Sequence, residues 1–141
     1  MFLTHLMTLP SIDVFNHCMH RWPDLKIITH HAGGTIPMME GRLNAGLESL
    51  GNRYAPEDAH AAKTDLKEKP LDAFRGLYTD TATFGSRIAM DAGIAFFGAP
   101  KTFFATDFPF AKIGETLAAA EGLDASVFFL NAARIFSLAS A

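Results

Sequence analysis

Three short runs of hydrophobic residues along the chain have the pattern of buried β-strands. They cover residues 25–29, 77–82 and 102–106, and they carry β-branched or aromatic residues and end at polar ones. Between and after these runs, hydrophobic residues recur at helical spacing. We expect helices over residues 11–21, 35–50, 86–97, 113–121 and 125–139, the last one capped by Asp124.

The order of these elements predicts the fold class. Strands that alternate with helices are typical of right-handed βαβ units, so we expect an α/β fold with three parallel strands and flanking helices. Residues 51–70 are polar and bracketed by Gly51 and Pro70, which indicates a surface excursion that could lie over a site. Since no repeat or flexible linker divides the chain, we treat residues 1–141 as one unit.

Composition narrows the class of protein. The 141 residues are 49% hydrophobic and 19% charged, with a net charge of −3, which suits one domain with a core and excludes a disordered chain. No run of five basic residues occurs, so we expect neither nucleic acid nor a membrane surface as partner. No stretch approaches the roughly 20 apolar residues of a membrane span, and no signal peptide is evident. Together with a single cysteine, Cys18, this predicts a soluble cytoplasmic protein.

Polar side chains lie where each predicted strand ends. They are the doublet His30 and His31 before Gly33, then Asp80, and then Asp107. The carboxyl ends of parallel strands meet at one edge of a sheet, where active sites are built. An imidazole there can bind a metal or transfer a proton near neutral pH. A carboxylate there is costly to desolvate unless it binds a cation, accepts hydrogen bonds or acts as a base.

Other roles for these residues stay open at this point. His30 or His31 could bond only to backbone at a strand end, and Asp107 could cap a turn. Asp80 could be a buried structural residue rather than one that faces a substrate. The turn at Gly33 also allows a phosphate site, although its sequence matches neither the dinucleotide fingerprint nor the P-loop.

Four segments in order resemble the amidohydrolase-related family, in the branch of aminocarboxymuconate-semialdehyde decarboxylase and the resorcylate-type decarboxylases. They are residues 22–37 (WPDLKIITHHAGGTIP), 77–81 (LYTDT), 104–110 (FATDFPF) and 131–136 (NAARIF). The resemblance implies a metal-dependent (β/α)8 barrel, usually with zinc. Its expected reaction is nonoxidative decarboxylation or hydrolysis of a small carboxylated aromatic or muconate-like compound.

The motifs also imply roles for residues of this chain. In that pattern His31 is the catalytic acid or base beside the metal, and Asp107 is a metal ligand. His30, Asp80 and Phe110 are further candidates for contact with the substrate.

The chain departs from the family pattern in one respect. The family's barrel begins with a His-x-His pair and has another metal histidine on its fifth strand, but no His-x-His occurs here. The chain therefore resembles only strands six to eight, a C-terminal part of a barrel that needs roughly 250 residues to close. We expect an incomplete metal site, and open sheet edges that a second copy or a complementary N-terminal half would cover. The alternative is a non-catalytic half-barrel that serves as an interaction module or is a remnant.

Overall fold

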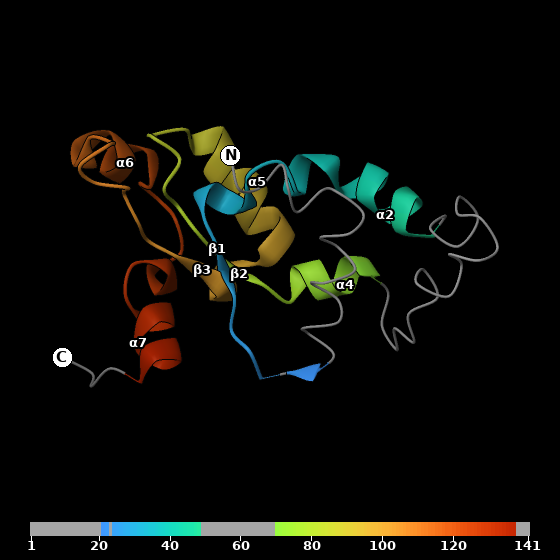
Figure 1. The fold of residues 1–141 in the computed structure, drawn as a ribbon. Helices are drawn as coiled ribbons and strands as arrows, with labels where there is room; N and C mark the ends of the chain where they lie inside the picture. Colours follow the sequence, from blue (N-terminus) through green and yellow to red (C-terminus); the bar gives the residue numbers. More distant parts are fainter. Residues whose placement is uncertain (1–20, 23, 49–69, 138–141) are drawn as a thin grey trace. The chain divides into compact units, whose positions relative to one another are not determined.

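A computed structural model describes residues 21–22, 24–48 and 70–137 of the chain (Figure 1). The helix predicted over residues 11–21, apart from its last residue, and nearly all of the predicted excursion over 51–70 lie outside these ranges. The chain divides into two compact units. The first comprises residues 1–26 and 38–76, and the second comprises residues 27–37 and 77–141.

The second unit is built on a parallel three-stranded sheet, which confirms the predicted α/β class. Its strands are β1 (Ile28–Thr29), β2 (Tyr78–Asp80) and β3 (Thr102–Phe103), in the spatial order β1-β2-β3. On the central strand, Thr79 lies opposite Thr29 on one side and opposite Thr102 on the other. Each strand falls inside a predicted run and is shorter than that run: β1 begins three residues after the start of its run, and β2 and β3 end before the ends of theirs.

Buried threonines are tolerated in this sheet because their hydroxyls find backbone acceptors. The Thr79 hydroxyl donates to the carbonyl of Thr29 at 3.3 Å, and the Thr29 hydroxyl donates to the carbonyl of Tyr78 at 3.1 Å. The Thr102 hydroxyl donates to the carbonyl of Gly98 at 3.0 Å. A buried hydroxyl without a partner would cost free energy, so these bonds allow polar residues inside the sheet.

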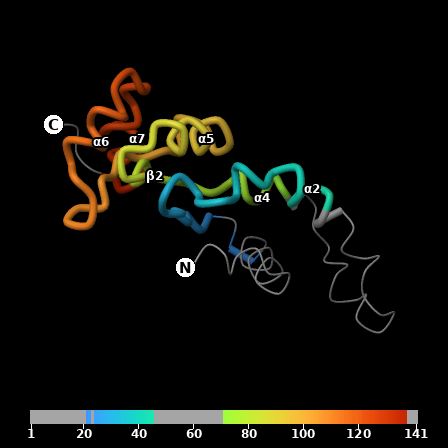
Figure 2. The backbone as a smooth tube through the Cα atoms, turned by 90° about the horizontal axis from the view of Figure 1, so that it is seen from above, coloured from blue at the N-terminus to red at the C-terminus, as the bar shows by residue number. Residues whose placement is uncertain are grey.

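Helices and 3-10 turns lie next to the sheet of the second unit (Figures 1 and 2). They are η1 (His31–Gly33), α5 (Arg87–Phe97), η4 (Ala99–Lys101), α6 (Ile113–Ala119), η5 (Ala125–Val127) and α7 (Leu130–Phe136). Helix α5 matches the predicted helix over 86–97. The Ser86 hydroxyl accepts from the Ala89 N–H at its start, and Gly98, with φ of 89°, ends it. Its buried side chains include Met90 and Phe97.

The single helix predicted over residues 125–139 is wrong, because the structure divides it into η5 and α7. Asp124 caps η5 as expected, since its Oδ1 accepts from the Ser126 N–H at 2.8 Å. The break follows because the Val127 carbonyl accepts from the N–H of Phe104 at 2.9 Å. A carbonyl engaged in this way is drawn out of the intrahelical ladder, and residues 128 and 129 form a turn instead.

The first unit contains α2 (Glu40–Glu48) and α4 (Pro70–Arg75), and Pro37–Met39 forms a 3-10 turn, η2, directly before α2. The structure thus places a helix within the predicted range 35–50. Helix α4 is an addition that the sequence pattern did not indicate, and it begins at a proline, which suits the first position of a helix. Arg75 pairs with Glu40, which ties α4 to α2. None of the helices in the described ranges is long and apolar enough to cross a membrane.

Candidate active site at the carboxyl ends of the strands

Three segments leave the sheet of the second unit at the carboxyl ends of its strands. They are residues 30–34 after β1, 81–86 after β2 and 104–111 after β3. In Figure 1 the chain leaves β1 and β2 toward the same side, where η1 lies beside α5. His30, His31 and Asp80 lie at or just beyond the ends of β1 and β2, and Asp107 and Phe110 lie on the segment that follows β3.

Asp80, the last residue of β2, is enclosed by groups of the chain itself. It is 6% exposed. Its Oδ1 accepts from the N–H of His31 at 2.8 Å and from the N–H of Ala82 at 3.1 Å. Its Oδ2 lies 3.2 Å from Nδ1 of His30, which therefore donates to it. This geometry is that of a buried structural residue, which is the alternative given for Asp80 in the sequence. A contact of Asp80 with substrate stays a prediction.

The ring of His31 is exposed, and one contact fixes its orientation. Its Nδ1 lies 2.6 Å from the carbonyl oxygen of Ala82. Because a carbonyl oxygen only accepts, Nδ1 carries the proton, and in the neutral ring Nε2 is the nitrogen with a lone pair. His31 therefore presents Nε2 as a base, a proton donor when charged, or a ligand.

The backbone that carries His31 is unusual. Residues 31–34 all have positive φ, at 56°, 55°, 80° and 60°. A residue with a side chain pays about 1–2 kcal/mol for this conformation. Close packing against α5 holds the segment, because a Cβ on Gly93 would lie 2.7 Å from Cβ of Ala32 and one on Gly33 would lie 2.4 Å from the Phe97 ring. The strained turn is thus fixed from the side of the helix.

Thr81 ties the segment after β3 to the central strand. Its hydroxyl donates to the carbonyl of Ala105 and accepts from the N–H of the same residue, both at 3.0 Å. The N–H of Thr81 donates to the carbonyl of Phe103 at 3.0 Å. The pairing between the segments after β2 and after β3 thus continues beyond the end of β3, as far as Ala105, two residues before Asp107.

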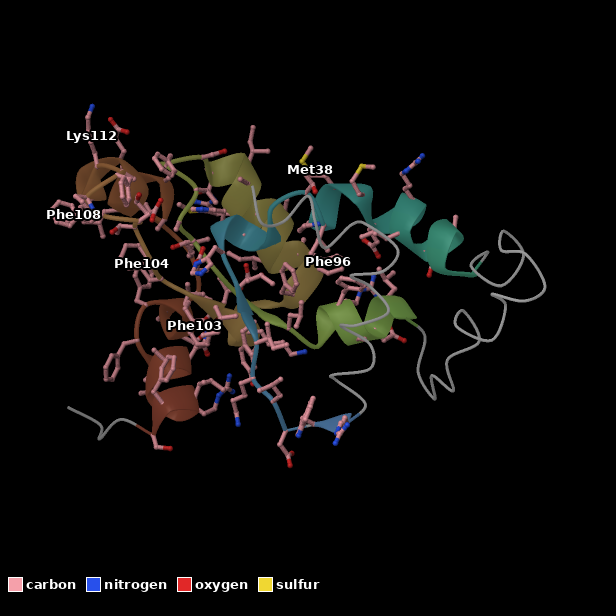
Figure 3. All side chains as sticks on the ribbon, in the orientation of Figure 1. Met38, Phe96, Phe103, Phe104, Phe108 and Lys112 are labelled. Carbon is pink, nitrogen blue, oxygen red and sulfur yellow. The ribbon has the colours of Figure 1, made fainter. Side chains whose placement is uncertain are left out.

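Asp107 lies in a tight turn with its carboxylate uncommitted. Its φ is 62°, and its backbone carbonyl accepts from the N–H groups of Phe110 and Ala111 at 2.9 and 3.1 Å. Backbone groups therefore close the turn, and within the described part of the chain no group hydrogen-bonds or pairs with the carboxylate. The peptide bond between Phe108 and Pro109 is cis. Phe108 projects outward on this loop beyond the sheet (Figure 3), and Phe110 is 80% exposed.

The described residues do not by themselves fit a catalytic metal ion, which usually takes three protein ligands. Across residues 21–22, 24–48 and 70–137, no three His, Cys, Asp or Glu side chains gather in one place. His30 and His31 are the histidines of these ranges, and the other four and Cys18 lie outside them. Asp107 as a metal ligand and His31 as the acid or base stay predictions.

The structure adds one side chain that the sequence patterns did not single out. The ring of Phe84 lies with its centroid 6.3 Å from that of His31, and it is 54% exposed. Its φ of 55° places it in the turn that follows β2. The signal in the sequence is the Phe-Gly pair just after a strand end, which is typical of a turn but says nothing about which residue it approaches.

The phosphate alternative has no geometric support in this segment. Gly33 ends the 3-10 turn η1, a second 3-10 turn, η2, follows at Pro37–Met39, and the first α-helix after them in the chain begins at Glu40. A helix start with an acidic residue in its first turn is unfavourable for an anion.

No protein-family model matches the chain, and no curated protein matches it. Solved structures do match. The chain is similar to 5-carboxyvanillate decarboxylase from Sphingomonas paucimobilis, with 25% identity and a TM-score of 0.73 over 89% of this chain and 38% of that one. It is also similar to 2,6-dihydroxybenzoate decarboxylase from Rhizobium, with 22% identity and a TM-score of 0.69 over 92% of this chain and 39% of that one.

A third matched structure contains a bound metal ion. It is a dihydroxybenzoic acid decarboxylase from Polaromonas sp. with bound manganese and the inhibitor 2-nitroresorcinol, with 23% identity and a TM-score of 0.70 over 93% of this chain and 39% of that one. The chain thus spans about two fifths of the length of these enzymes. The matches confirm the predicted resemblance to amidohydrolase-related decarboxylases and the predicted fold, a three-stranded part of a (β/α)8 barrel.

Proposed function

We propose that this chain, which resembles a C-terminal portion of an amidohydrolase-related barrel, carries part of the active site of a metal-dependent decarboxylase. The observation that carries the proposal is the oriented imidazole of His31 at the carboxyl edge of the parallel strands. The matched enzymes are named for hydroxylated benzoic acids, which supports a small aromatic acid as substrate and favours decarboxylation over hydrolysis.

In this proposal His31 supplies a proton. Nonoxidative decarboxylation breaks the bond between the ring carbon and the carboxylate, releases CO₂ and leaves an electron pair that a proton must take up. A charged His31 keeps Nδ1–H on the Ala82 carbonyl and gives the proton of Nε2 to that ring carbon. Proton transfer of this kind contributes about 10²–10⁴-fold in rate.

The expected cofactor is a divalent metal ion, with Asp107 as one ligand. Its uncommitted carboxylate supports this role, and the other ligands would come from outside the described residues. The family resemblance implies zinc, whereas the matched structure from Polaromonas names manganese. Both ions therefore belong in the test.

The experiment measures CO₂ release from 2,6-dihydroxybenzoate and 5-carboxyvanillate with Mn²⁺ or Zn²⁺. The chain is assayed alone and together with the polypeptide encoded directly upstream. We expect His31→Asn to lower the rate by about 10²-fold or more and Asp107→Asn to lower metal retention as well. Asp91→Asn is the matched control, because Asp91 is exposed on α5 and pairs with Arg87. Full activity of His31→Asn would refute the assignment.

A non-catalytic interaction module is the second candidate function, and the exposed apolar surface favours it. In the second unit, large hydrophobic side chains stay exposed on the loops and on three helices. They are Phe84, Ile88, Phe108, Phe110, Ile113, Leu117, Phe128, Phe129, Leu130 and Phe136. Tight association with a partner in the absence of any turnover would favour this candidate over the enzyme.

A further inference from the structure

We infer that Asp80 is a positioning residue, which fixes the orientation and the tautomer of His31 through one of its two carboxylate oxygens. The inference deepens the proposed function and rests on it for its catalytic meaning. Its structural part stands on hydrogen bonds within the second unit and can be tested without turnover.

Three hydrogen bonds form a closed cycle around Oδ1 of Asp80. This oxygen accepts from the backbone N–H of His31 at 2.8 Å and from the N–H of Ala82 at 3.1 Å. The cycle closes where Nδ1–H of His31 donates to the carbonyl of Ala82 at 2.6 Å. Asp80 thus places both the backbone of His31 and the acceptor of its ring proton.

The cycle supplies what the end of a strand lacks. After Thr29 the chain leaves the ladder, so the N–H of His31 has no strand partner, and its φ of 56° is unfavourable for a residue with a side chain. A buried carboxylate is itself stable only when donors surround it. The strained turn and the buried carboxylate therefore stabilise each other, and the position of Nε2 follows from both.

The second oxygen has a separate partner. Oδ2 of Asp80 lies 3.2 Å from Nδ1 of His30, whose side chain is 77% exposed, whereas that of Asp80 is 8% exposed. His30 can leave this contact for water, but the cycle at Oδ1 is internal to the unit. Oδ1 is therefore the oxygen that controls His31, and the His30 contact is secondary.

The test reads the imidazole tautomers directly, by two-dimensional ¹H–¹⁵N NMR of the chain with ¹⁵N-labelled histidine near neutral pH. We expect the His31 signals of a ring protonated at Nδ1. Asp80→Asn keeps an oxygen acceptor at the Oδ1 position but turns Oδ2 into an NH₂ donor, so the His31 signals stay and the neutral ring of His30 moves its proton to Nε2. Asp80→Ala removes the cycle, and His31 then shows the averaged signals of a free ring.

Two controls separate positioning from a general effect of lost charge. His30→Ala should leave the His31 tautomer unchanged, and so should Asp91→Ala, which removes an exposed carboxylate of the same unit. The inference is overturned if His31 keeps its Nδ1 proton in folded Asp80→Ala. If Asp80→Ala does not fold, the Asp80→Asn variant provides the test. If its His31 signals shift as much as its His30 signals, the two carboxylate oxygens do not have separate roles and the inference is overturned.

In a preparation with decarboxylase activity, the kcat and KM of the Asp80 variants provide a second test. Asp80→Ala should lower kcat by about 10²-fold with little change in KM, because the acid is misplaced while substrate contacts remain. Asp80→Asn should stay within about tenfold of the parent. If Asp80→Ala changes the His31 tautomer but leaves the kcat of the active preparation unchanged, the proton-donor role of His31 is refuted and the positioning role stands. If kcat falls while the tautomer stays unchanged, the positioning role is overturned and the proposed reaction stands.

Discussion

At the scale of single residues, two side chains at the end of β2 hold the segments that follow the neighbouring strands β1 and β3. These segments carry the candidate residues His31 and Asp107. Asp80 holds the His31 segment on one side, and Thr81 holds the segment that leads to Asp107 on the other. Both act through polar atoms buried at a strand end, where an unpaired donor or acceptor is costly. The contribution of such a side chain to the free energy of unfolding thus depends on whether its polar atoms have a hydrogen-bond partner, and not on burial alone.

The same substitution at two buried threonines tests this dependence. Thr81→Val removes a hydroxyl that serves both backbone groups of Ala105, so we expect a loss of about 1–3 kcal/mol in the free energy of unfolding. Thr116 is fully buried in α6, and its hydroxyl has no partner among the described residues. Thr116→Val should therefore be neutral or stabilise by about 1 kcal/mol. Urea denaturation of both variants checks the opposite signs, and equal destabilisation would contradict the argument.

At the scale of elements, α5 serves as the platform for the turn at His31. Its buried side is interrupted by Gly93, whose missing side chain lets the backbone of the turn approach. Gly93 lies in a helix interior, where alanine would otherwise be favoured by about 1 kcal/mol. The helix thus accepts a poor helix former so that the turn can pack on it.

Two glycine substitutions compare helix propensity with this packing. In Gly93→Ala the new Cβ would lie 2.7 Å from Cβ and 2.9 Å from the carbonyl oxygen of Ala32, so we expect destabilisation by about 1–3 kcal/mol despite the better propensity. In Gly114→Ala, in α6, the new Cβ meets nothing within 4 Å, and we expect no loss and up to about 1 kcal/mol of gain. Thermal unfolding by circular dichroism measures both, and a stabilising Gly93→Ala would show that the contact is not tight.

The start of η5 gives a pH-dependent prediction. Hydrogen bonds from the side chain and then from the backbone N–H of Ser126 lower the pKa of Asp124 below its usual value of 3.8. A lowered pKa in the folded state means that the charged carboxylate adds stability above the unfolded pKa and that this contribution is lost as the pH falls through the folded pKa. Wild type should therefore have a higher Tm than Asp124→Asn near pH 7, and the difference should vanish well below pH 3.8. A difference that stays constant with pH would contradict a role for the charge.

At the scale of the whole molecule, the described sheet lacks the neighbours of a closed barrel. Within residues 21–22, 24–48 and 70–137, β1 and β3 each pair only with β2, so each has an unpaired edge. Unpaired strand edges and exposed apolar side chains both favour association. The share of the matched enzymes that the chain covers, 38% of the first, agrees with a sheet that further strands would extend.

Association in solution is the prediction at this scale. We expect the chain to sediment as a dimer or larger species at micromolar concentration, and the species to become smaller when exposed apolar side chains of the second unit are replaced. Phe129→Glu combined with Leu130→Glu is the test variant, and Lys112→Glu is the control, because Lys112 is exposed and charged already. A wild-type chain that stays monomeric and dispersed over the whole concentration range would contradict the prediction.

The sequence by itself determined the order of the three strands, the position of α5 between the second and third of them, and where chemistry could lie. Alternation of hydrophobic runs, together with the cap predicted at Asp124, is local information, and this cap forms as the pattern indicates. The same pattern locates the polar residues at the strand ends. A buried strand ends where polar side chains follow its apolar run, and at the edge of a sheet such side chains can reach solvent or a ligand. The four motif segments were sufficient to predict the decarboxylase-like fold.

Only the tertiary structure decided how these residues act together. The break between η5 and α7 depends on a bond from Phe104, and the role of Asp80 depends on N–H groups that β1 brings beside it. Asp80 and His31 are 49 residues apart, and only the parallel register of β1 on β2 determines which oxygen meets which donor. Local periodicity contains no such register, because it arises from the packing of whole strands and helices.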